Sequence, residues 1–150
     1  GDLFIIDTGS VFDSYYCDFD RNYAFGSISE AAKTAYRVTY EATEAGFNAA
    51  QVGKTTSDIF NAMNDVLQKG GALGNTVGRL GHGLGMQLTE WPSNTQNDNT
   101  MLEPGVVLTL EPGMAFLPGK EMVHEENIVI TENGPEWLSI RAAEELPIIQ

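Results

Sequence analysis

Four acidic residues of this 150-residue chain lie within or directly against apolar sequence: Asp7, Asp18, Glu111 and Glu125. A buried carboxylate is costly, so each one taken alone predicts a cap, an ion pair or a solvated strand end. His82, one of only two histidines, lies in the stretch LGHGLG, where glycines let the backbone and a ligand approach closely. Together, these side chains are of the types that bind divalent cations.

The charge balance favours metal ions as partners of these carboxylates. The chain has 21 Asp and Glu but only eight Lys and Arg, and its formal net charge is −13. If the four carboxylates converge, repulsion forces protons onto them unless cations neutralise the site. Two divalent ions would match the four charges and leave the imidazole as a neutral ligand. Such donors suit Mn²⁺, Co²⁺, Fe²⁺ or Zn²⁺, and two ions about 3.5–4 Å apart can share a water and lower its pKa.

The composition sets limits on the class, the partners and the compartment. The length fits a single domain, and a hydrophobic fraction of 42% is enough to form a core. The strongly acidic balance argues against nucleic acid and anionic membrane surfaces as partners. The single cysteine, Cys17, excludes an internal disulfide and indicates a reducing, cytoplasmic location. No apolar run approaches transmembrane length.

Hydrophobic periodicity predicts an α+β fold whose strands carry the candidate ligands. Strands are expected at residues 3–7, 15–25, 106–112 and 124–131, the first two antiparallel, with a short final strand after ENGPEW. A helix is expected at residues 30–45, preceded by a capping box from Ser27 to Glu30 and ended by Gly46.

A second helix has a clearer apolar face. Its face is formed at helical spacing by Ile59, Phe60, Met63, Val66 and Leu67. Thr56 or Ser57 is expected to cap this helix, and the pair Gly70-Gly71 is expected to end it. The simplest interpretation of the apolar face is core packing.

Five segments in order, IIDTG, CDFDR, GHGLG, LTLEPGM and EENIVIT, resemble the catalytic domain of the creatinase/aminopeptidase family, which includes methionine aminopeptidase, aminopeptidase P and prolidase. The resemblance spans nearly the whole chain, and the five motifs in order are far more specific than GHGLG alone. It implies the pita-bread fold, a curved, mostly antiparallel sheet with helices on its outer face. The family's metal ligands correspond to Asp7, Asp18, His82, Glu111 and Glu125.

The resemblance also implies a role for each ligand. Asp18 and Glu125 would bridge two metal ions, His82 and Glu111 would complete one of them, and Asp7 would chelate the other. A hydroxide bridging the metals would attack a peptide or small amide bond. Glu111 would take its proton and pass it to the leaving amine, which makes Glu111 and His82 the expected catalytic residues. The implied activity is that of a two-metal hydrolase of the Xaa-Pro dipeptidase or aminopeptidase type, acting on small peptides.

Glu126 competes with Glu125 for the place of the last ligand. Neighbouring residues on a strand face opposite ways, so only one of the two can point at the site. Spacing alone leaves both possible, whereas the family motif selects Glu125. His124 must then face away from Glu125 in a regular strand, and it is expected to be a packing or supporting residue.

Two departures from the family pattern bear on the peptidase chemistry. Family peptidases usually carry a second histidine seven residues after the first, where this chain has Thr89 in the sequence TEWP. Threonine can donate a hydrogen bond but cannot carry a positive charge. Prolidase and aminopeptidase P relatives often have an arginine two residues before the last glutamate, where this chain has Val123. Thr89 and Trp91 are the candidates for contacting substrate.

These departures leave two alternatives to a peptidase. One is a creatinase-like hydrolase or lyase of a small metabolite, although creatinase itself does not retain the metal ligands. The other is a non-catalytic binding module with the same fold, although such relatives typically lose those ligands. The chain begins with Gly1 and runs at once into a strand. Residues 1–150 are therefore expected to be the C-terminal part of a pita-bread catalytic domain, without the upstream segment or any N-terminal domain, in a protein that dimerises at full length.

Overall fold

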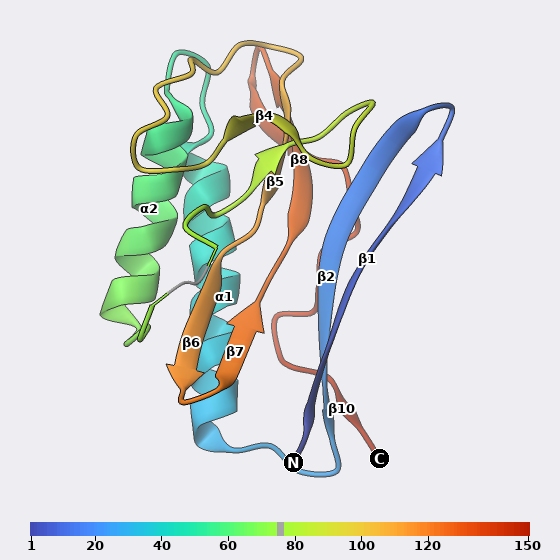
Figure 1. Cartoon of the computed structure of the whole chain (residues 1–150), viewed down its shortest axis with the longest axis vertical. Helices are drawn as coiled ribbons and strands as arrows, with labels where there is room; N and C mark the ends of the chain where they lie inside the picture. Colours follow the sequence, from blue (N-terminus) through green and yellow to red (C-terminus); the bar gives the residue numbers. More distant parts are fainter. Residues whose placement is uncertain (75–76) are drawn as a thin grey trace.

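The computed structural model describes residues 1–74 and 77–150 and has an α+β architecture (Figure 1). Two helices lie on one side of the molecule, a long β-hairpin stands on the other, and most of the remaining strands run between them. The helices are α1 (Glu30–Ala49) and α2 (Thr56–Lys69). The strands are β1 (Leu3–Phe12), β2 (Tyr15–Phe25), β3 (His82–Gly83), β4 (Glu90–Ser93), β5 (Val107–Leu110), β6 (Gly113–Leu117), β7 (Lys120–Val123), β8 (Glu126–Thr131), β9 (Gly134–Trp137) and β10 (Ile148–Ile149).

The hairpin of β1 and β2 is antiparallel, as predicted, and β1 is longer than the expected residues 3–7. Its two-residue turn, Asp13-Ser14, has positive φ at both positions, which suits the right-handed twist of the flanking strands. This turn fixes the register, so that Asp7 lies opposite Asp20 and Gly9 lies opposite Asp18. Strand β10 pairs with the other edge of β2.

A five-stranded sheet in the order β4-β3-β5-β8-β9 carries the rest of the predicted site. Strands β5 and β8 are antiparallel, and their register pairs Leu110 with Glu126. Both strands are shorter than the predicted residues 106–112 and 124–131. As a result Glu111 directly follows β5 and Glu125 directly precedes β8, which places the two glutamates at the same end of the sheet.

The core lies between the helices and the sheets. Helix α1 packs against α2 on one side and against β5, β6 and β7 on the other (Figure 1). The apolar face predicted for the second helix enters this core, where Ile59 and Met63 are fully buried. Neither described helix is long and apolar enough to cross a bilayer.

Helix α1 begins at the predicted Glu30, but its cap and its end differ from the prediction. Ser29, rather than Ser27, is the N-cap, because its hydroxyl accepts a hydrogen bond from the amide of Ala32 at 3.2 Å. The helix does not end before Gly46 but continues to Ala49. Gly46 is needed for packing instead, since a Cβ there would lie 2.7 Å from the sulfur of a buried methionine on α2.

Helix α2 is capped one residue earlier than predicted. The hydroxyl of Thr55 accepts from the amide of Asp58, and the Asp58 carboxylate accepts from the amide of Thr55, which is a complete capping box. Thr56 and Ser57 are buried, and their hydroxyls donate to backbone carbonyls of the loop before β5. The predicted end is confirmed, because Gly70 is the C-cap.

Replacing Gly70 with alanine should destabilise the protein by about 1–3 kcal/mol through overpacking. Any residue can adopt the backbone torsion angles of Gly70 (φ −78°, ψ 0°), so the substitution causes no backbone strain. An added Cβ, however, would lie 2.4 Å from Cγ1 of Val38, a stiff side chain buried on α1. Urea or thermal unfolding measures the effect. The neighbouring exposed Lys69→Ala should stay within about 0.5 kcal/mol, and equal stability of Gly70→Ala and the parent would contradict the packing analysis.

Candidate metal centre

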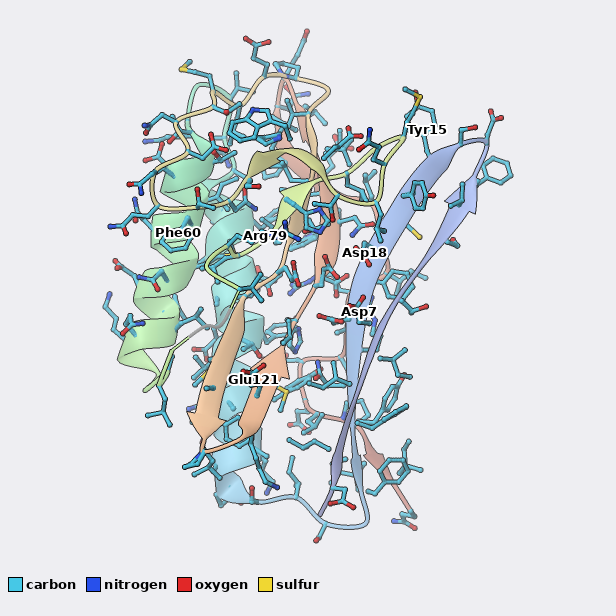
Figure 2. The ribbon with its side chains drawn as sticks, viewed as in Figure 1. Asp7, Tyr15, Asp18, Phe60, Arg79 and Glu121 are labelled. Atoms are coloured by element: carbon cyan, nitrogen blue, oxygen red, sulfur yellow. The ribbon has the colours of Figure 1, made fainter. Side chains whose placement is uncertain are left out.

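Carboxylates and one imidazole converge between the hairpin and the five-stranded sheet. Figure 2 shows Asp7 and Asp18 on the side of the hairpin that faces this sheet. His82 comes from β3, Glu111 from the end of β5 and Glu125 from the start of β8. The structure therefore brings all five sequence-predicted ligands to one region of the molecule.

Two asparagines fasten the hairpin to the strands that carry the glutamates. The Asn127 side chain accepts a hydrogen bond from the Asp18 amide at 3.0 Å and donates to the Asp18 carbonyl oxygen. Asn22 donates to the carbonyl oxygen of Val123 at 2.7 Å. Because Asn127 lies two residues after Glu125, the bridge sets the position of one aspartate against that of one glutamate.

His82 is held by its backbone and by its own ring. Its amide donates to the hydroxyl of Thr109 at 3.1 Å, and Gly81, at φ +122°, lies so close to Thr109 that a Cβ would be 2.2 Å from the carbonyl oxygen of that residue. The ring Nδ1 lies 2.9 Å from the carbonyl oxygen of Gly83. A carbonyl can only accept, so Nδ1 carries the proton and Nε2 presents its lone pair.

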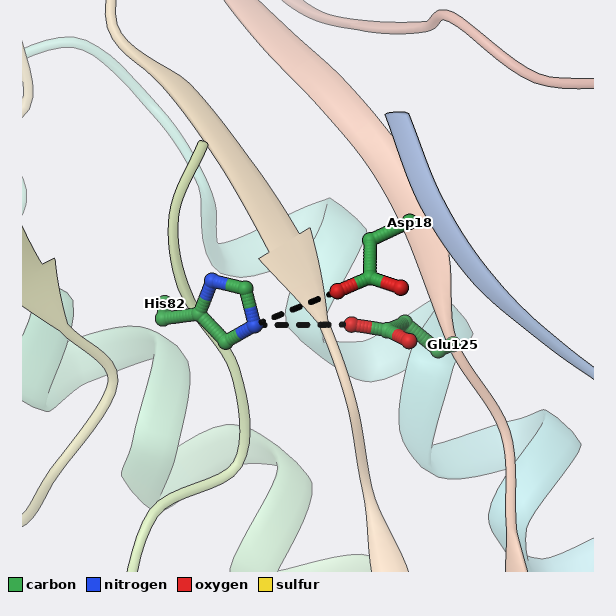
Figure 3. A group of neighbouring side chains, drawn as sticks. All are labelled: Asp18, His82 and Glu125. Carbon is green, nitrogen blue, oxygen red and sulfur yellow. Dashed lines mark ion pairs between the residues drawn. The ribbon is translucent and has the colours of Figure 1, made fainter. Parts of the chain in front are cut away.

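The free Nε2 of His82 faces three carboxylates, of which Figure 3 shows Asp18 and Glu125. It lies 3.8 Å from Asp18 Oδ2, 3.7 Å from Glu125 Oε1 and 3.9 Å from Glu111 Oε2. These distances exceed a hydrogen bond, and burial lowers the pKa of His82, which keeps the ring neutral. A lone pair surrounded by carboxylate oxygens is unfavourable unless a cation lies between them. The geometry thus fits a metal ion.

The donor atoms fall into two groups that share Glu125. One group is Asp18, His82 and Glu125, and the other is Asp7, Asp20 and Glu125, with the ligand atoms of each group within 4.8 Å of one another. Glu125 is 2% exposed, and its Oε1 has no hydrogen-bond partner among the described residues. A carboxylate shared between two donor groups in this way could contact two neighbouring cations.

Burial and mutual repulsion disfavour the charged forms of these acids. Burial, followed by the charges of neighbouring acids, raises the pKa of Glu125 to about 9, that of Asp20 to about 7 and that of Asp18 to about 6. Burial also raises the pKa of Glu111. Bound cations would reverse these shifts, because they stabilise the ionised carboxylates.

Glu126 is committed to a structural network on the other face of β8. Its Oε2 accepts from Arg21 Nη2 at 3.2 Å and from the hydroxyl of Ser139 at 2.7 Å, while Oε1 accepts from the amide of Ala142. Geometry therefore favours Glu125 over Glu126 as the ligand, in agreement with the motif. His124 is fully buried among aromatic rings and makes no hydrogen bond through its ring among the described residues.

The two candidate substrate contacts lie at the surface. Thr89 is exposed and Trp91 is 70% exposed, and both lie in or just before β4, which pairs with the strand of His82. Val123 lines a small cavity together with Arg79 and Glu111. Arg79 thus lies close to Val123, and its charge favours the ionised form of Glu111.

Sequence analysis missed two charged residues of this region, Asp20 and Arg79. Asp20 was detectable from the hairpin, because a two-residue turn at Asp13-Ser14 places Asp20 opposite Asp7. It also lies two residues after Asp18 and hence on the same face of the strand. Arg79 has no such local signal, since it precedes His82 in a segment without regular secondary structure.

Comparison with known proteins places these motifs in context. Residues 1–132 match the model of metallopeptidase family M24. The Xaa-Pro dipeptidase of Pyrococcus furiosus is 34% identical over 140 residues, which are 93% of this chain and 40% of that protein. The crystal structure of the X-Pro aminopeptidase from Thermotoga maritima superposes with a TM-score of 0.89 at 28% identity, covering 99% of this chain and 42% of that one.

The prolidase from Pyrococcus furiosus superposes with a TM-score of 0.89 at 31% identity, and the alignment covers 95% of this chain and 42% of the prolidase. Sequence and structure thus agree on the same group of proteins. The chain spans about two fifths of the length of the curated relatives that it matches.

Without bound metal, the protein should become less stable as the pH rises from 5 to 9. Glu125, Asp20 and Asp18 have pKa values above the ordinary 4.5 and 3.8, so the folded state holds protons that the unfolded chain has released. The contribution of these protons to the free energy of unfolding is fully present below the ordinary pKa values. It is lost as the pH rises through the folded-state pKa values of about 6 for Asp18, 7 for Asp20 and 9 for Glu125. Thermal unfolding with a chelator present measures it. Glu125→Gln should flatten the curve, and a melting temperature that increased to pH 9 would refute the assignment.

Glutamine substitutions should distinguish the role of Glu125 in metal binding from the structural role of Glu126. Glu125→Gln should weaken Mn²⁺ binding by at least about tenfold, because even supporting partners of a metal ligand have effects of that size. Glu126→Gln should leave the metal stoichiometry unchanged but lower stability by about 1–3 kcal/mol, because Arg21 and Ser139 lose a charged acceptor. Calorimetric titration and urea unfolding measure the two effects, and the reverse pattern would assign the ligand to Glu126.

Proposed function

The chain belongs to metallopeptidase family M24, and from this premise we propose that it forms the metal-binding part of a hydrolase of the Xaa-Pro dipeptidase or aminopeptidase type. It has the α+β pita-bread fold of that family. The observation that carries the proposal is the neutral His82 Nε2 facing Asp18, Glu111 and Glu125 at 3.7–3.9 Å. These distances are longer than hydrogen bonds, and a cation bound between the four groups would account for the arrangement.

We assign two divalent ions to the five predicted ligands. Asp18 and Glu125 would contact both ions, His82 and Glu111 one, and Asp7 the other. The sharing of Glu125 between the two donor groups supports this division. The mixed oxygen and imidazole donors are compatible with manganese, cobalt, zinc or iron. When bound, the ions would supply an activated water and polarise the carbonyl of the scissile bond.

Glu111 is the residue to which we assign proton transfer. Its side chain is 24% exposed, whereas those of His82 and Glu125 are 3% and 2% exposed, so Glu111 is the more accessible to an entering substrate. Burial raises its pKa, which suits a carboxylate that accepts a proton and returns it to the leaving amine. The part of His82 is to hold its Nε2 lone pair in place through the bond of Nδ1 to the Gly83 carbonyl.

Thr89 and Trp91 are proposed to contact the substrate. Strand β4 pairs with β3, so that Glu90 lies opposite Gly83 and Ser93 opposite His82. The exposed side chains of Thr89 and Trp91 therefore border the strand of the candidate metal ligand. A small peptide is the proposed substrate, following the activity named for the Pyrococcus furiosus relative.

We propose that residues 1–150 are the C-terminal part of a longer, cytoplasmic and dimeric protein. The relatives are more than twice as long as the aligned segment. The outer strand of the hairpin also exposes Phe4, Val11 and Phe12, with Phe12 86% exposed. Apolar side chains on an edge strand are consistent with cover by upstream residues of the same protein.

The complete protein should hydrolyse Xaa-Pro dipeptides when supplied with Mn²⁺ or Co²⁺. Glu111→Ala should reduce kcat by about 10²-fold or more, because a positioned acid–base group contributes 10²–10⁴-fold, while the melting temperature of the metal-free protein changes little. The exposed Glu103→Ala is the matched control and should retain activity. Intact dipeptides together with turnover of small non-peptide amides would instead favour the creatinase-like alternative.

A further inference from the structure

Asp20 is a buried carboxylate at the centre that none of the five assigned ligands accounts for. It lies opposite Asp7 in the hairpin and on the same strand face as Asp18, and it is 3% exposed. Like charges directly opposite one another destabilise an antiparallel pair. The register thus places three aspartates on adjacent positions of one small surface, where they need a positively charged partner.

No protein cation among the described residues meets that need at Asp20. The Oδ1 atom of Asp20 is buried without a hydrogen-bond partner in this part of the chain. The neighbouring Arg21 donates to the backbone carbonyl oxygen of Asp20 rather than to its carboxylate, and its other donor is used by Glu126 and by the carbonyl of Ile140. Alternation along the strand explains this, since Arg21 and Asp20 face opposite ways.

The oxygens of Asp20 point toward two other carboxylates. Asp7, Asp20 and Glu125 each offer an oxygen, and these oxygens lie within 4.8 Å of one another. Oε1 of Glu125 is also buried without a hydrogen-bond partner among the described residues. Asp20 and Glu125, each more than nine-tenths buried, thus each have one oxygen without a hydrogen-bond partner among the described residues, and a cation bound between them would satisfy these oxygens.

This group differs chemically from the one around His82. The group of Asp18, His82 and Glu125 mixes imidazole and carboxylate, whereas the group of Asp7, Asp20 and Glu125 offers oxygen alone. We propose that Asp20 is an additional metal ligand in the half of the two-metal centre that contains Asp7, where every ligand is a carboxylate and suits a hard divalent cation such as Mn²⁺. The inference rests on the metal centre of the proposed function and adds a ligand to it.

Titration of the complete, metal-free protein with Mn²⁺ tests the assignment. The wild type should bind two ions, and Asp20→Asn, which keeps the shape of the side chain, should bind one ion as before and the other at least tenfold more weakly. Dialysis with metal analysis gives the stoichiometry, and the electron paramagnetic resonance signal of a coupled Mn²⁺ pair should disappear in the variant at limiting metal. Asp65→Asn, on the exposed face of α2, is the matched control and should bind as the wild type does.

The possible results separate this inference from the proposed function. If Asp20→Asn binds two ions with wild-type affinities, Asp20 is not a ligand, and the two-metal hydrolase proposal stands. If the wild type binds no Mn²⁺, both are overturned. If Asp20→Asn loses both ions, Asp20→Glu decides: recovery of the second ion by this longer carboxylate supports ligation, and failure to recover it overturns the inference.

Discussion

Repulsion among carboxylates held together by two sheets is the constraint on which the structure of this centre depends. The hairpin and the β5–β8 pair are fixed by their own ladders and by the core, so the acids cannot separate to relieve their charge. Of the arginines, Arg21 is paired with Glu126 and Arg141 with Glu44, whereas Arg79 lies beside Glu111 and favours its ionised form. Divalent cations bound between the acids would supply the additional positive charge within this small volume.

Proton binding is the alternative way to relieve the same repulsion, and it links the chemistry of the site to its folding. Burial raises the pKa of Glu125 to about 9, so the metal-free protein at neutral pH holds protons where the loaded protein would hold ions. Glu111, at the more exposed edge, retains access to solvent. The candidate site thus contains buried side chains, such as Glu125 and His82, and one more exposed carboxylate, Glu111, which can exchange protons with solvent.

Much of this arrangement was predictable from sequence, and the failures have physical causes. The apolar periodicity around Ile59 marks a helix because core burial decides it, whereas Gly46 was misjudged as a stop, since only tertiary packing shows that α1 must pass close to Met63. Motif order identified the five candidate ligands, which the structure brings to one region of the molecule. Asp20 was missed because its importance depends on its pairing with Asp7 across the hairpin, and this pairing becomes evident only once the turn at Asp13-Ser14 has fixed the register.

The amide of Asn127 has a consequence beyond positioning Asp18. The Asn127 side chain accepts a hydrogen bond from the Asp18 amide and donates one to the Asp18 carbonyl oxygen. It therefore forms the same pair of hydrogen bonds that a neighbouring strand would form, at the place where the hairpin meets the five-stranded sheet. The candidate metal centre lies at this contact, with its aspartates on the hairpin and with His82 and Glu125 on the five-stranded sheet. Cations bound at this centre would contact residues of both the hairpin and the sheet, so metal binding would stabilise the contact between them.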